Sequence, residues 1–288
     1  MKWVIVGARG MLGTELVHLL GKQDESVMSL HRGNFSMTSL VENPALMFAN
    51  VDVIINAAAY TNVDKAESEP EEAYFTNATL PKMLGIAAQQ VNARFIQIST
   101  DYVFRGDSSL PYLPEDTPDP ISVYGRSKRE GEEATLGFDN SQVIRTAWLY
   151  GRFGSCFPKT IATKLRASEK LKIVGDQIGS PTHAKDLAAF IVQAGNSVVK
   201  QRILHGVSLG SASWYEFGVE IAKSLRVSPS SISEISSDSL STGAKRPRYS
   251  LLKPSSLENF AFAHWKSAWH QSSHDVLGLM PEKNYPLH

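Results

Sequence analysis

A short apolar run near the amino terminus leads directly into three evenly spaced glycines. Trp3–Val6 is typical of a buried strand, and Gly7, Gly10 and Gly13 follow it where an amphipathic helix begins. In such a turn one glycine permits the tight bend, one lets the backbone approach a pyrophosphate, and one lets helix and strand pack closely. The pattern predicts a dinucleotide site at the start of the helix, and the alternative is a plain strand-to-helix turn.

The first half of the chain alternates short β-branched runs with longer helical patterns. This alternation predicts an α/β protein with a doubly wound parallel sheet of the Rossmann type. The expected strands are Trp3–Val6, Val27–Leu30, Val51–Asn56, Arg94–Ser99 and Gln142–Ala147, and the later helices cover about 70–90 and 122–136. We expect the first helix to end at a C-cap formed by Gly21.

The second half is less regular and predicts a smaller α/β domain. Its strand-like runs are Leu171–Val174 and Ile203–Val207, and its helical runs are Ala184–Ala194 and Trp214–Leu225. We expect a dinucleotide-binding domain over 1–150 and a substrate-binding domain over 151–288, with a soft boundary, because elements of the second domain often return to the first. The serine-rich stretch Ser228–Ser241 is expected to be a solvated surface segment.

Charge and cysteine content narrow the function classes. The 288 residues include 29 Lys and Arg and 29 Asp and Glu, so that the formal net charge is zero. This balance gives no electrostatic basis for sequence-independent nucleic-acid binding or for docking on anionic membranes. A single cysteine, Cys156, cannot form an internal disulfide, and no apolar run is long enough for a membrane span. We therefore expect a cytoplasmic protein, and the sequence leaves open whether it is a monomer or a homodimer.

The residues after the second expected strand bear on the type of dinucleotide. NAD sites usually carry an acidic residue there, whereas this chain has His31 followed by Arg32. A guanidinium can pair with a 2′-phosphate, so Arg32 favours NADPH, with NADH possible. The alternative is that Arg32 is an ordinary surface charge.

A tyrosine and a lysine lie four residues apart on one expected helix. Tyr124 and Lys128 therefore share a helix face. Reduction of a carbonyl needs a proton donor, and a nearby ammonium favours the phenolate form of a tyrosine and lowers its pKa. The same lysine can hold the ribose of a nicotinamide nucleotide.

The same spacing occurs a second time, in Tyr249 and Lys253. That copy lies between two prolines, which is a poor setting for a helix. The first copy also follows a strand that closes with Ser99 and Thr100, and hydroxyls at the carboxyl edge of a parallel sheet lie where such folds bind ligands. We therefore expect the Thr100 hydroxyl to contact both the substrate carbonyl and the tyrosine.

Several motifs in one order resemble the extended short-chain dehydrogenases/reductases and, among them, the dTDP-4-dehydrorhamnose reductase family. The resemblance covers most of the chain. Besides the glycine turn, it rests on VDVIINAAAYTNVDKAE (Val51–Glu67), STDYVFRG (Ser99–Gly106), YGRSKREGE (Tyr124–Glu132), RTAWLYG (Arg145–Gly151), DQIGSPT (Asp176–Thr182) and the pair Arg246-Pro247.

The resemblance implies a role for each matching residue. Tyr124 is implied to be the general acid, Lys128 its partner and ribose anchor, and Thr100 the group that tunes the tyrosine. The positions implied to line the dinucleotide are Gly10, Met11, Leu12, Ala59, Tyr60 and Thr61, with Asn34 and Phe35 on the adenine side and Asn77 near the lysine. Those implied to face the deoxysugar nucleotide are Val63, Asp101, Tyr102 and Trp148.

Three further expectations come from the residues themselves. Ala57 and Ala58 give a strand end the small side chains that a flat cofactor against the backbone requires. The Trp148 indole follows a strand end, where it can stack on a sugar or pack in the core. Arg246 can neutralise a diphosphate or be an ordinary surface arginine.

The chain departs from its relatives at a metal site. Some relatives hold magnesium between subunits with clustered glutamates, and Glu15 matches one of those positions. Lys185 and Asp186 stand where another glutamate is expected. We therefore expect no metal and take Glu15 as a carboxylate on a helix surface.

The implied function is reduction of the C4 keto group of dTDP-4-dehydro-β-L-rhamnose by NADPH, giving dTDP-β-L-rhamnose for surface polysaccharide. One alternative is another sugar-nucleotide reductase, epimerase or dehydratase, although dehydratases typically have an acidic pair after the threonine, where this chain has Asp101 and Tyr102. A second is a non-catalytic relative, the regulatory subunit of methionine adenosyltransferase.

Overall fold

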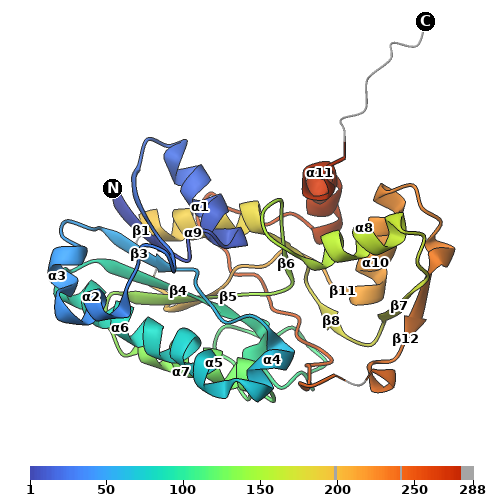
Figure 1. The fold of residues 1–288 in the computed structure, drawn as a ribbon, viewed down its shortest axis with the longest axis horizontal. Helices are drawn as coiled ribbons and strands as arrows, with labels where there is room; N and C mark the ends of the chain where they lie inside the picture. Colours follow the sequence, from blue (N-terminus) through green and yellow to red (C-terminus); the bar gives the residue numbers. More distant parts are fainter. Residues whose placement is uncertain (198–199, 241, 280–288) are drawn as a thin grey trace, which may run out of the picture.

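A six-stranded parallel sheet forms the centre of the larger of two lobes in the computed structural model, which describes residues 1–197, 200–240 and 242–279 (Figure 1). Its strand order is β10-β5-β4-β3-β1-β2. The strands are β1 (Lys2–Val6), β2 (Ser26–Leu30), β3 (Val53–Asn56), β4 (Arg94–Thr100), β5 (Ser141–Thr146) and β10 (Ile203–His205). The predicted doubly wound α/β fold is confirmed.

The order of strands determines where a ligand can bind. The chain leaves β1 for β2 on one side and then returns to β3 on the other side. In open α/β sheets, ligands bind at the carboxyl ends of strands where the winding changes direction. The turn after β1 and the segment after β3 therefore border the expected binding crevice.

Helices cover both faces of this sheet (Figure 1). On one face, α1 (Met11–Gly21) packs against α9 (Ala184–Asn196), and their leucines, alanines and Phe190 share a core with β1 and β4. On the other face lie α2 (Met37–Glu42), α3 (Pro44–Met47), α6 (Leu80–Gln90) and α7 (Val123–Leu136). Because both faces are covered, the central strands are apolar at nearly every position.

The helical stretch predicted over 70–90 is continuous but not uniformly α-helical. It consists of α5 (Pro70–Tyr74), the π-helical segment η1 (Phe75–Thr79) and α6, and it follows the short helix α4 (Val63–Ser68). The π-helical turn carries Asn77, and such turns often occur at functional sites.

The smaller lobe is built on helices and three short strand pairs. Its helices are α8 (Phe157–Arg166), α10 (Trp214–Ser224) and α11 (Trp265–Leu277), and the single turns η3 (Pro229–Ser231) and η4 (Ser237–Ser239) lie between α10 and α11. Its strands pair as β7 (Leu171–Val174) with β12 (Ile232–Ile235), β8 (Ile178–Gly179) with β11 (Ala212–Ser213), and β6 (Leu149–Tyr150) with β9 (Thr182–His183). Tyr150, Phe217 and Trp269 are fully buried in its core.

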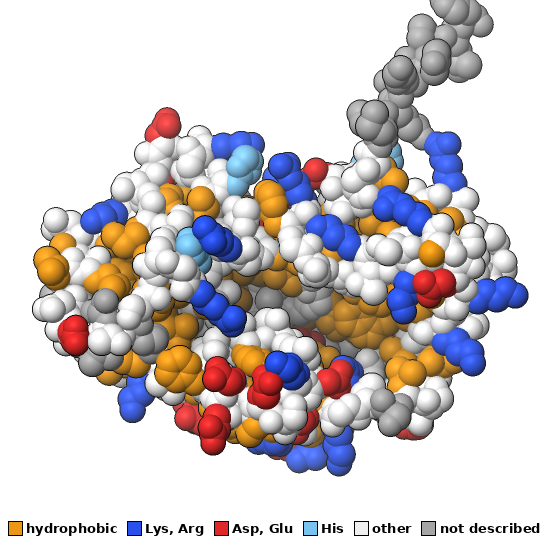
Figure 2. Space-filling model, viewed as in Figure 1, with side chains coloured by type: hydrophobic (Ala, Val, Ile, Leu, Met, Phe, Trp, Pro, Cys, Tyr) orange, Lys and Arg blue, Asp and Glu red, His pale blue; other side chains and the backbone are white. Residues whose placement is uncertain are grey.

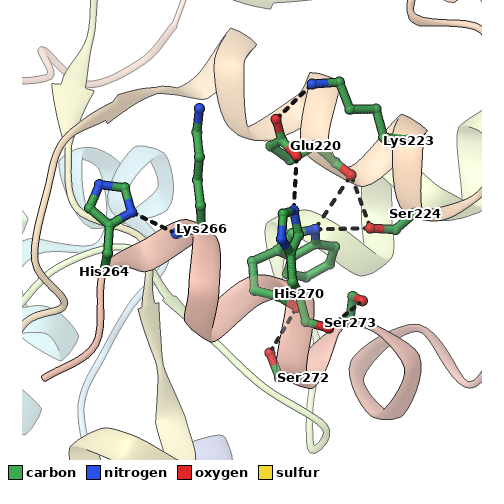
Figure 3. Close-up of polar contacts among 9 residues, drawn as sticks. Glu220, Lys223, Ser224, His264, Lys266, His270, Ser272 and Ser273 are labelled. Carbon is green, nitrogen blue, oxygen red and sulfur yellow. Dashed lines mark hydrogen bonds and ion pairs between the residues drawn. The ribbon is translucent and has the colours of Figure 1, made fainter.

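Polar contacts join α10 to α11 at the edge of that core (Figure 3). The Glu220 carboxylate accepts hydrogen bonds from Lys223 at 2.8 Å and lies 3.2 Å from Nε2 of His270. The Trp269 indole donates to Ser224 at 3.0 Å. These contacts hold the last described helix on the smaller lobe.

Three expectations about the fold are wrong. Gly21 is the last residue of α1 rather than its cap, because Lys22 caps the helix in an ordinary helical conformation and the left-handed residue is Asp24 (φ 55°). The serine-rich stretch is not only a solvated segment, because Ile232 within it is buried in β12; Ser241 lies outside the described residues. Glu15 is 7% exposed and so is not a surface carboxylate.

The domain division at about residue 150 stays a prediction. Both β10 and α9, from the second half of the chain, belong to the layers of the larger lobe, as the soft boundary allowed. Among the described residues, no helix has the length and apolar character to cross a membrane.

Two glycines of α1 provide a matched stability test. A Cβ at Gly13 would lie 2.2 Å from the Gly7 carbonyl oxygen, whereas one at Gly21 would meet no described atom within 4 Å. We predict that Gly13→Ala lowers the free energy of unfolding by about 2 kcal/mol. Gly21→Ala should change it by less than about 1 kcal/mol, in the stabilising direction. Urea denaturation of both variants checks this, and equal stabilities would contradict the close approach.

Candidate functional site at the carboxyl edge of the sheet

The glycine turn has the geometry of a phosphate cradle. Gly7 adopts φ +83°, and a Cβ there would lie 2.6 Å from the Ala58 backbone nitrogen. Gly10 is the N-cap of α1, where no described side chain caps the helix. The first backbone N–H groups of α1 are thus available to an anion, which the helix dipole also favours.

The segment after β3 lies against this turn. It contains Ala57, Ala58, Ala59, Tyr60 and Thr61, the first four half-buried and the last exposed. The buried side chain of Asn56 accepts a hydrogen bond from the Ala58 N–H at 3.1 Å, which fixes the start of the segment.

Asn77 fixes the far end of this segment and links it to α7. Its Oδ1 accepts from the Tyr60 N–H at 2.9 Å, and its Nδ2 donates to the Tyr60 carbonyl and to Oγ of Ser127, at 3.1 and 3.0 Å. At Gly131 of α7 a Cβ would lie only 2.0 Å from the Asn77 carbonyl oxygen. The Asn77 amide therefore holds the segment after β3 at a set distance from α7.

The three expected catalytic side chains meet where β4 ends. Thr100 is the last residue of β4, and Tyr124 and Lys128 lie on α7, whose N-cap is Ser122. All three are buried, with 6%, 9% and 3% of their surface exposed. The Thr100 hydroxyl donates to Oδ1 of Asp101 at 3.0 Å and lies near enough to Tyr124 to influence its pKa, and Nζ of Lys128 donates to the Ile98 carbonyl at 2.6 Å.

Burial dominates the electrostatics of this group. It raises the pKa of Tyr124 to about 12, a shift that the Thr100 hydrogen bond opposes and the nearby Asp101 carboxylate reinforces. It lowers the pKa of Lys128 to about 8, against the attraction of Glu132. Thr100, rather than the lysine expected from the sequence, thus supplies the contact that lowers the tyrosine pKa.

The turn after β2 carries the residues expected on the adenine side. Arg32 is exposed. Phe35 is half-buried and packs against the core on the sheet face that α2 and α6 cover. The Asn34 side chain stabilises the turn itself, because its Oδ1 accepts from the His31 N–H at 2.8 Å and its Nδ2 donates to the Ser29 carbonyl at 2.9 Å. The roles of these residues toward a cofactor stay predictions.

Two buried hydroxyls at this edge have no hydrogen-bond partner among the described residues. They are Oγ of Ser99 on β4 and Oγ1 of Thr146 on β5. Buried polar groups are nearly always paired in native proteins. Together with the glycine cradle, these unpaired groups fit a site that is completed by a polar ligand.

The expected substrate residues surround the tyrosine on its open side. The Tyr102 ring meets Tyr124 edge-on, with centroids 5.5 Å apart, and Val63 packs into the same cluster. Burial raises the pKa of Asp101, next to Thr100, to about 6. Figure 2 shows that the surface is hollowed between the two lobes and that hydrophobic side chains are exposed in the hollow.

Trp148 and Arg246 both make contacts that the sequence did not predict. Trp148, at φ +47°, stacks on Trp214 of α10 with centroids 3.6 Å apart, so that one face of its indole is covered. Arg246 donates to both carboxylate oxygens of Asp64 on α4, at 3.0 and 2.6 Å, and Asp64 also accepts from the Ala244 N–H at 3.0 Å. This ion pair joins the two lobes.

The structure also discriminates between the two Tyr–Lys spacings. Tyr249 and Lys253 lie in an extended stretch between η4 and α11, not on a helix, as the flanking prolines predicted.

Sequence reasoning missed Asp64 and Trp214 as neighbours of the site. Asp64 lies within a motif that was recognised, whereas no local pattern marks Trp214. Among the described residues, no group of three or more His, Cys, Asp or Glu side chains could hold a metal.

Residues 1–278 match the model of a known family, the RmlD substrate binding domain. The chain belongs to this family. A family relative, the dTDP-4-dehydrorhamnose reductase of Streptomyces griseus, is 35% identical over 94% of this chain and 92% of its own length. The spore coat polysaccharide biosynthesis protein SpsK of Bacillus subtilis is 33% identical over 93% of this chain and 95% of its own.

A solved structure shares the fold over nearly its whole length. The dTDP-4-dehydrorhamnose reductase of Bacillus anthracis, crystallised in complex with NADP, superposes with a TM-score of 0.88 at 32% identity. The match covers 95% of this chain and 99% of that chain. The resemblance predicted from the motifs is thereby confirmed.

The bridging role of Asn77 gives a prediction for this site. Asn77→Ala removes the partners of two backbone groups of Tyr60, so we expect the free energy of unfolding to fall by about 2 to 3 kcal/mol. Asn196→Ala, at the exposed end of α9, should change it by less than about 0.5 kcal/mol. Chemical denaturation measures both. A loss at Asn77 no larger than that at Asn196 would show that the bridge is dispensable.

Proposed function

We propose that this protein is an NADPH-dependent oxidoreductase that reduces the C4 keto group of dTDP-4-dehydro-β-L-rhamnose to give dTDP-β-L-rhamnose. The observation that carries the proposal is the burial of Thr100 at the end of β4 and of Tyr124 and Lys128 on α7, which Lys128 ties to β4. It occurs in a chain 35% identical to a dTDP-4-dehydrorhamnose reductase along nearly all of its length. The product would serve the synthesis of surface polysaccharide, in line with the name of the relative SpsK.

The glycine turn and the segment after β3 would hold the cofactor. The backbone around Gly7, Gly10, Met11, Leu12 and Gly13 offers N–H groups to the pyrophosphate. Ala57–Thr61 would lie against the nicotinamide half, with Asn77 behind it and Ser99 offering its unpaired hydroxyl. Asn34 and Phe35 would flank the adenine. The relative from Bacillus anthracis was solved with NADP, and the exposed Arg32 suits a 2′-phosphate.

Each catalytic side chain then has a defined task. Bound NADPH supplies the hydride that C4 accepts. The Tyr124 hydroxyl, which its high pKa keeps protonated, gives its proton to the developing C4 alkoxide. The Thr100 hydroxyl stabilises the oxygen on which negative charge develops. Lys128 uses one N–H for the Ile98 carbonyl and has two left for the ribose hydroxyls.

The sugar nucleotide would occupy the hollow between the lobes. Val63, Asp101 and Tyr102 border the Tyr124 side of it, and Trp148, which packs against Trp214 and Gly179, would line another part of it. Arg246 is half-buried and already bound by Asp64, so a diphosphate would have to share or replace that carboxylate. The choice of thymine as the base, a monomeric or homodimeric state and a cytoplasmic location belong to this proposal as predictions.

The alternatives have less support. A dehydratase needs a second acid after the threonine, and the residue after Asp101 is Tyr102, whose pKa burial raises. A non-catalytic regulatory subunit has no need of a buried Tyr124 and Lys128 pair beside Thr100. No specific contact in the described residues favours either function.

The proton donor is tested by a matched pair of substitutions. We predict that Tyr124→Phe lowers kcat for dTDP-4-dehydrorhamnose by about 10² to 10⁴, since general acid catalysis typically contributes that factor. Tyr249→Phe, in the non-helical copy of the spacing, should retain kcat within about twofold. The loss of NADPH absorbance on oxidation measures both, and full activity of Tyr124→Phe would refute the assignment.

The charge of Lys128 predicts the pH dependence. The proposed role requires its ammonium, and its pKa is about 8, so kcat should fall as the pH rises through this value. Tyr124 stays protonated over the same range because its pKa is about 12. A pH–rate profile of kcat checks the sign, and activity that rises through pH 8 would contradict the role of the lysine.

Cofactor preference tests the turn after β2. We predict that Arg32→Ala raises the Kd for NADPH about tenfold, since one charge-assisted contact is worth about 1.5 kcal/mol or more, and leaves the Kd for NADH unchanged. Lys22→Ala, an exposed cation at the end of α1, is the control and should change neither. Titration of nucleotide fluorescence gives both constants. An equal loss for both nucleotides would show that Arg32 does not read the 2′-phosphate.

A further inference from the structure

The catalytic helix carries a third buried polar residue in register with the first two. Tyr124, Lys128 and Glu132 follow one another at intervals of four along α7 and therefore share one face. Glu132 is fully buried, unlike its neighbour Glu133, which is 57% exposed. A buried carboxylate needs a partner, because desolvation of an unpaired charge is costly.

That partner is Arg145 on β5, the first residue of the motif RTAWLYG (Arg145–Gly151). Its Nε and Nη2 donate to the two oxygens of Glu132 at 2.9 and 2.8 Å, and the guanidinium is also fully buried. Glu132 is the last residue of the motif that begins with Tyr124. The ion pair therefore connects two motifs through residues that have no role in the proposed chemistry. The fork geometry sets the rotation and the height of α7 relative to β5.

Arg145 is itself held from the opposite side. Its Nη1 donates to the Pro114 carbonyl at 3.2 Å, and its guanidinium lies 4.9 Å from the centre of the Phe104 ring. His205 of β10 lies 3.5 Å away, and its other ring nitrogen faces the Lys253 carbonyl at 3.2 Å. Burial and the guanidinium lower the pKa of His205 to about 3, so it adds no charge.

Glu132 also balances the charge of the lysine. The ionisable groups that face Lys128 or Glu132 include Tyr124 and Arg129 of the helix itself, Asp101 and Tyr102 of η2 (Asp101–Val103), Glu67 of α4, Arg145 and His205; Arg129 lies 3.9 Å from Glu132 and 2.8 Å from the exposed Glu133. Glu132 is the group whose negative charge opposes the effect of burial on Lys128. Without it, Lys128 would share a dry environment with the uncompensated guanidinium of Arg145.

We propose that Glu132 and Arg145 are positioning residues for the proposed reduction: their buried ion pair sets the register of α7 against β5, and the Glu132 carboxylate keeps Lys128 charged. The inference rests on the proposed function, in which Lys128 acts as an ammonium. Stability alone does not require such a pair, because apolar residues of similar volume often stabilise a core equally well. Glu132 suits this role because it lies one helical turn from Lys128.

The pH–rate profile of kcat separates positioning from mere structure. In Glu132→Gln, Arg145 remains charged, so the pH midpoint for loss of activity should move down by about 1 unit, as expected for one nearby charge. Glu133→Gln makes the same chemical change on the exposed side of α7, where Glu133 contacts Arg129, and should leave the midpoint in place. A Glu132→Gln midpoint equal to that of the wild type would overturn the inference.

A double variant guards against misfolding of the single one. Breaking one partner of a buried pair is strongly destabilising, whereas neutralising both is far better tolerated. In Glu132→Gln/Arg145→Gln the stray positive charge is gone, so the midpoint should lie between those of the wild type and Glu132→Gln. A double variant shifted as far as the single one, or further, would contradict the charge-balance argument.

The pH dependence of NADPH binding decides the inference independently of turnover. If Lys128 holds the ribose, the Kd for NADPH should rise with pH at the midpoint of its deprotonation, and at a lower pH in Glu132→Gln than in Glu133→Gln. Fluorescence titration measures this without any sugar nucleotide. Lack of wild-type turnover with dTDP-4-dehydrorhamnose would overturn the proposed function only, whereas coincident binding profiles of the two variants would overturn the positioning role.

Discussion

The site depends on one hydrogen bond between a buried ammonium and a strand. Nζ of Lys128 donates to the Ile98 carbonyl at 2.6 Å and so ties α7 to β4 two residues before the strand ends. Thr100 follows at that end, and Tyr124 lies one helical turn before the lysine. Burial of a charged lysine costs solvation free energy, and the surrounding polar groups reduce that cost.

The second lobe completes the site by closing over this edge. The Asp64–Arg246 pair and the Trp148–Trp214 stack both cross from one lobe to the other. The first contact occupies part of the Arg246 guanidinium, and the second covers one face of the Trp148 indole. In the proposed function the larger lobe would provide the reacting groups, and the contacts between the lobes would determine the space for the sugar nucleotide.

Local patterns predicted the parts of the fold that local physics controls. The strands of the larger sheet, the glycine turn and the helix over 123–136 depend on hydrophobic runs, close backbone approaches and the Ser122 cap, all of which are visible in the sequence. The predicted C-cap of α1 was wrong, because Asp24, rather than the expected Gly21, adopts the left-handed conformation after the helix. The strand β12 was missed, because its partner strand β7 is distant in sequence.

The site also contains residues that local patterns predict and contacts that only tertiary packing creates. Thr100, Tyr124 and Lys128 could be predicted because each lies at a recognisable position on a strand end or a helix face. The partners of Arg246 and Trp148 could not, since Asp64 and Trp214 reach them only through the packing of the two lobes. Nor does spacing reveal that Glu132 is buried while Glu133 is exposed; the contact with Arg145 decides that.

A crystal structure of the protein with NADP⁺ and dTDP-β-L-rhamnose would test the central claim most directly. We predict that the pyrophosphate lies on the backbone of the glycine turn and that Lys128 contacts the nicotinamide ribose. The Tyr124 hydroxyl should lie within hydrogen-bond distance of the sugar O4. A complex in which the nicotinamide ring and O4 both lie away from Tyr124 would contradict the account.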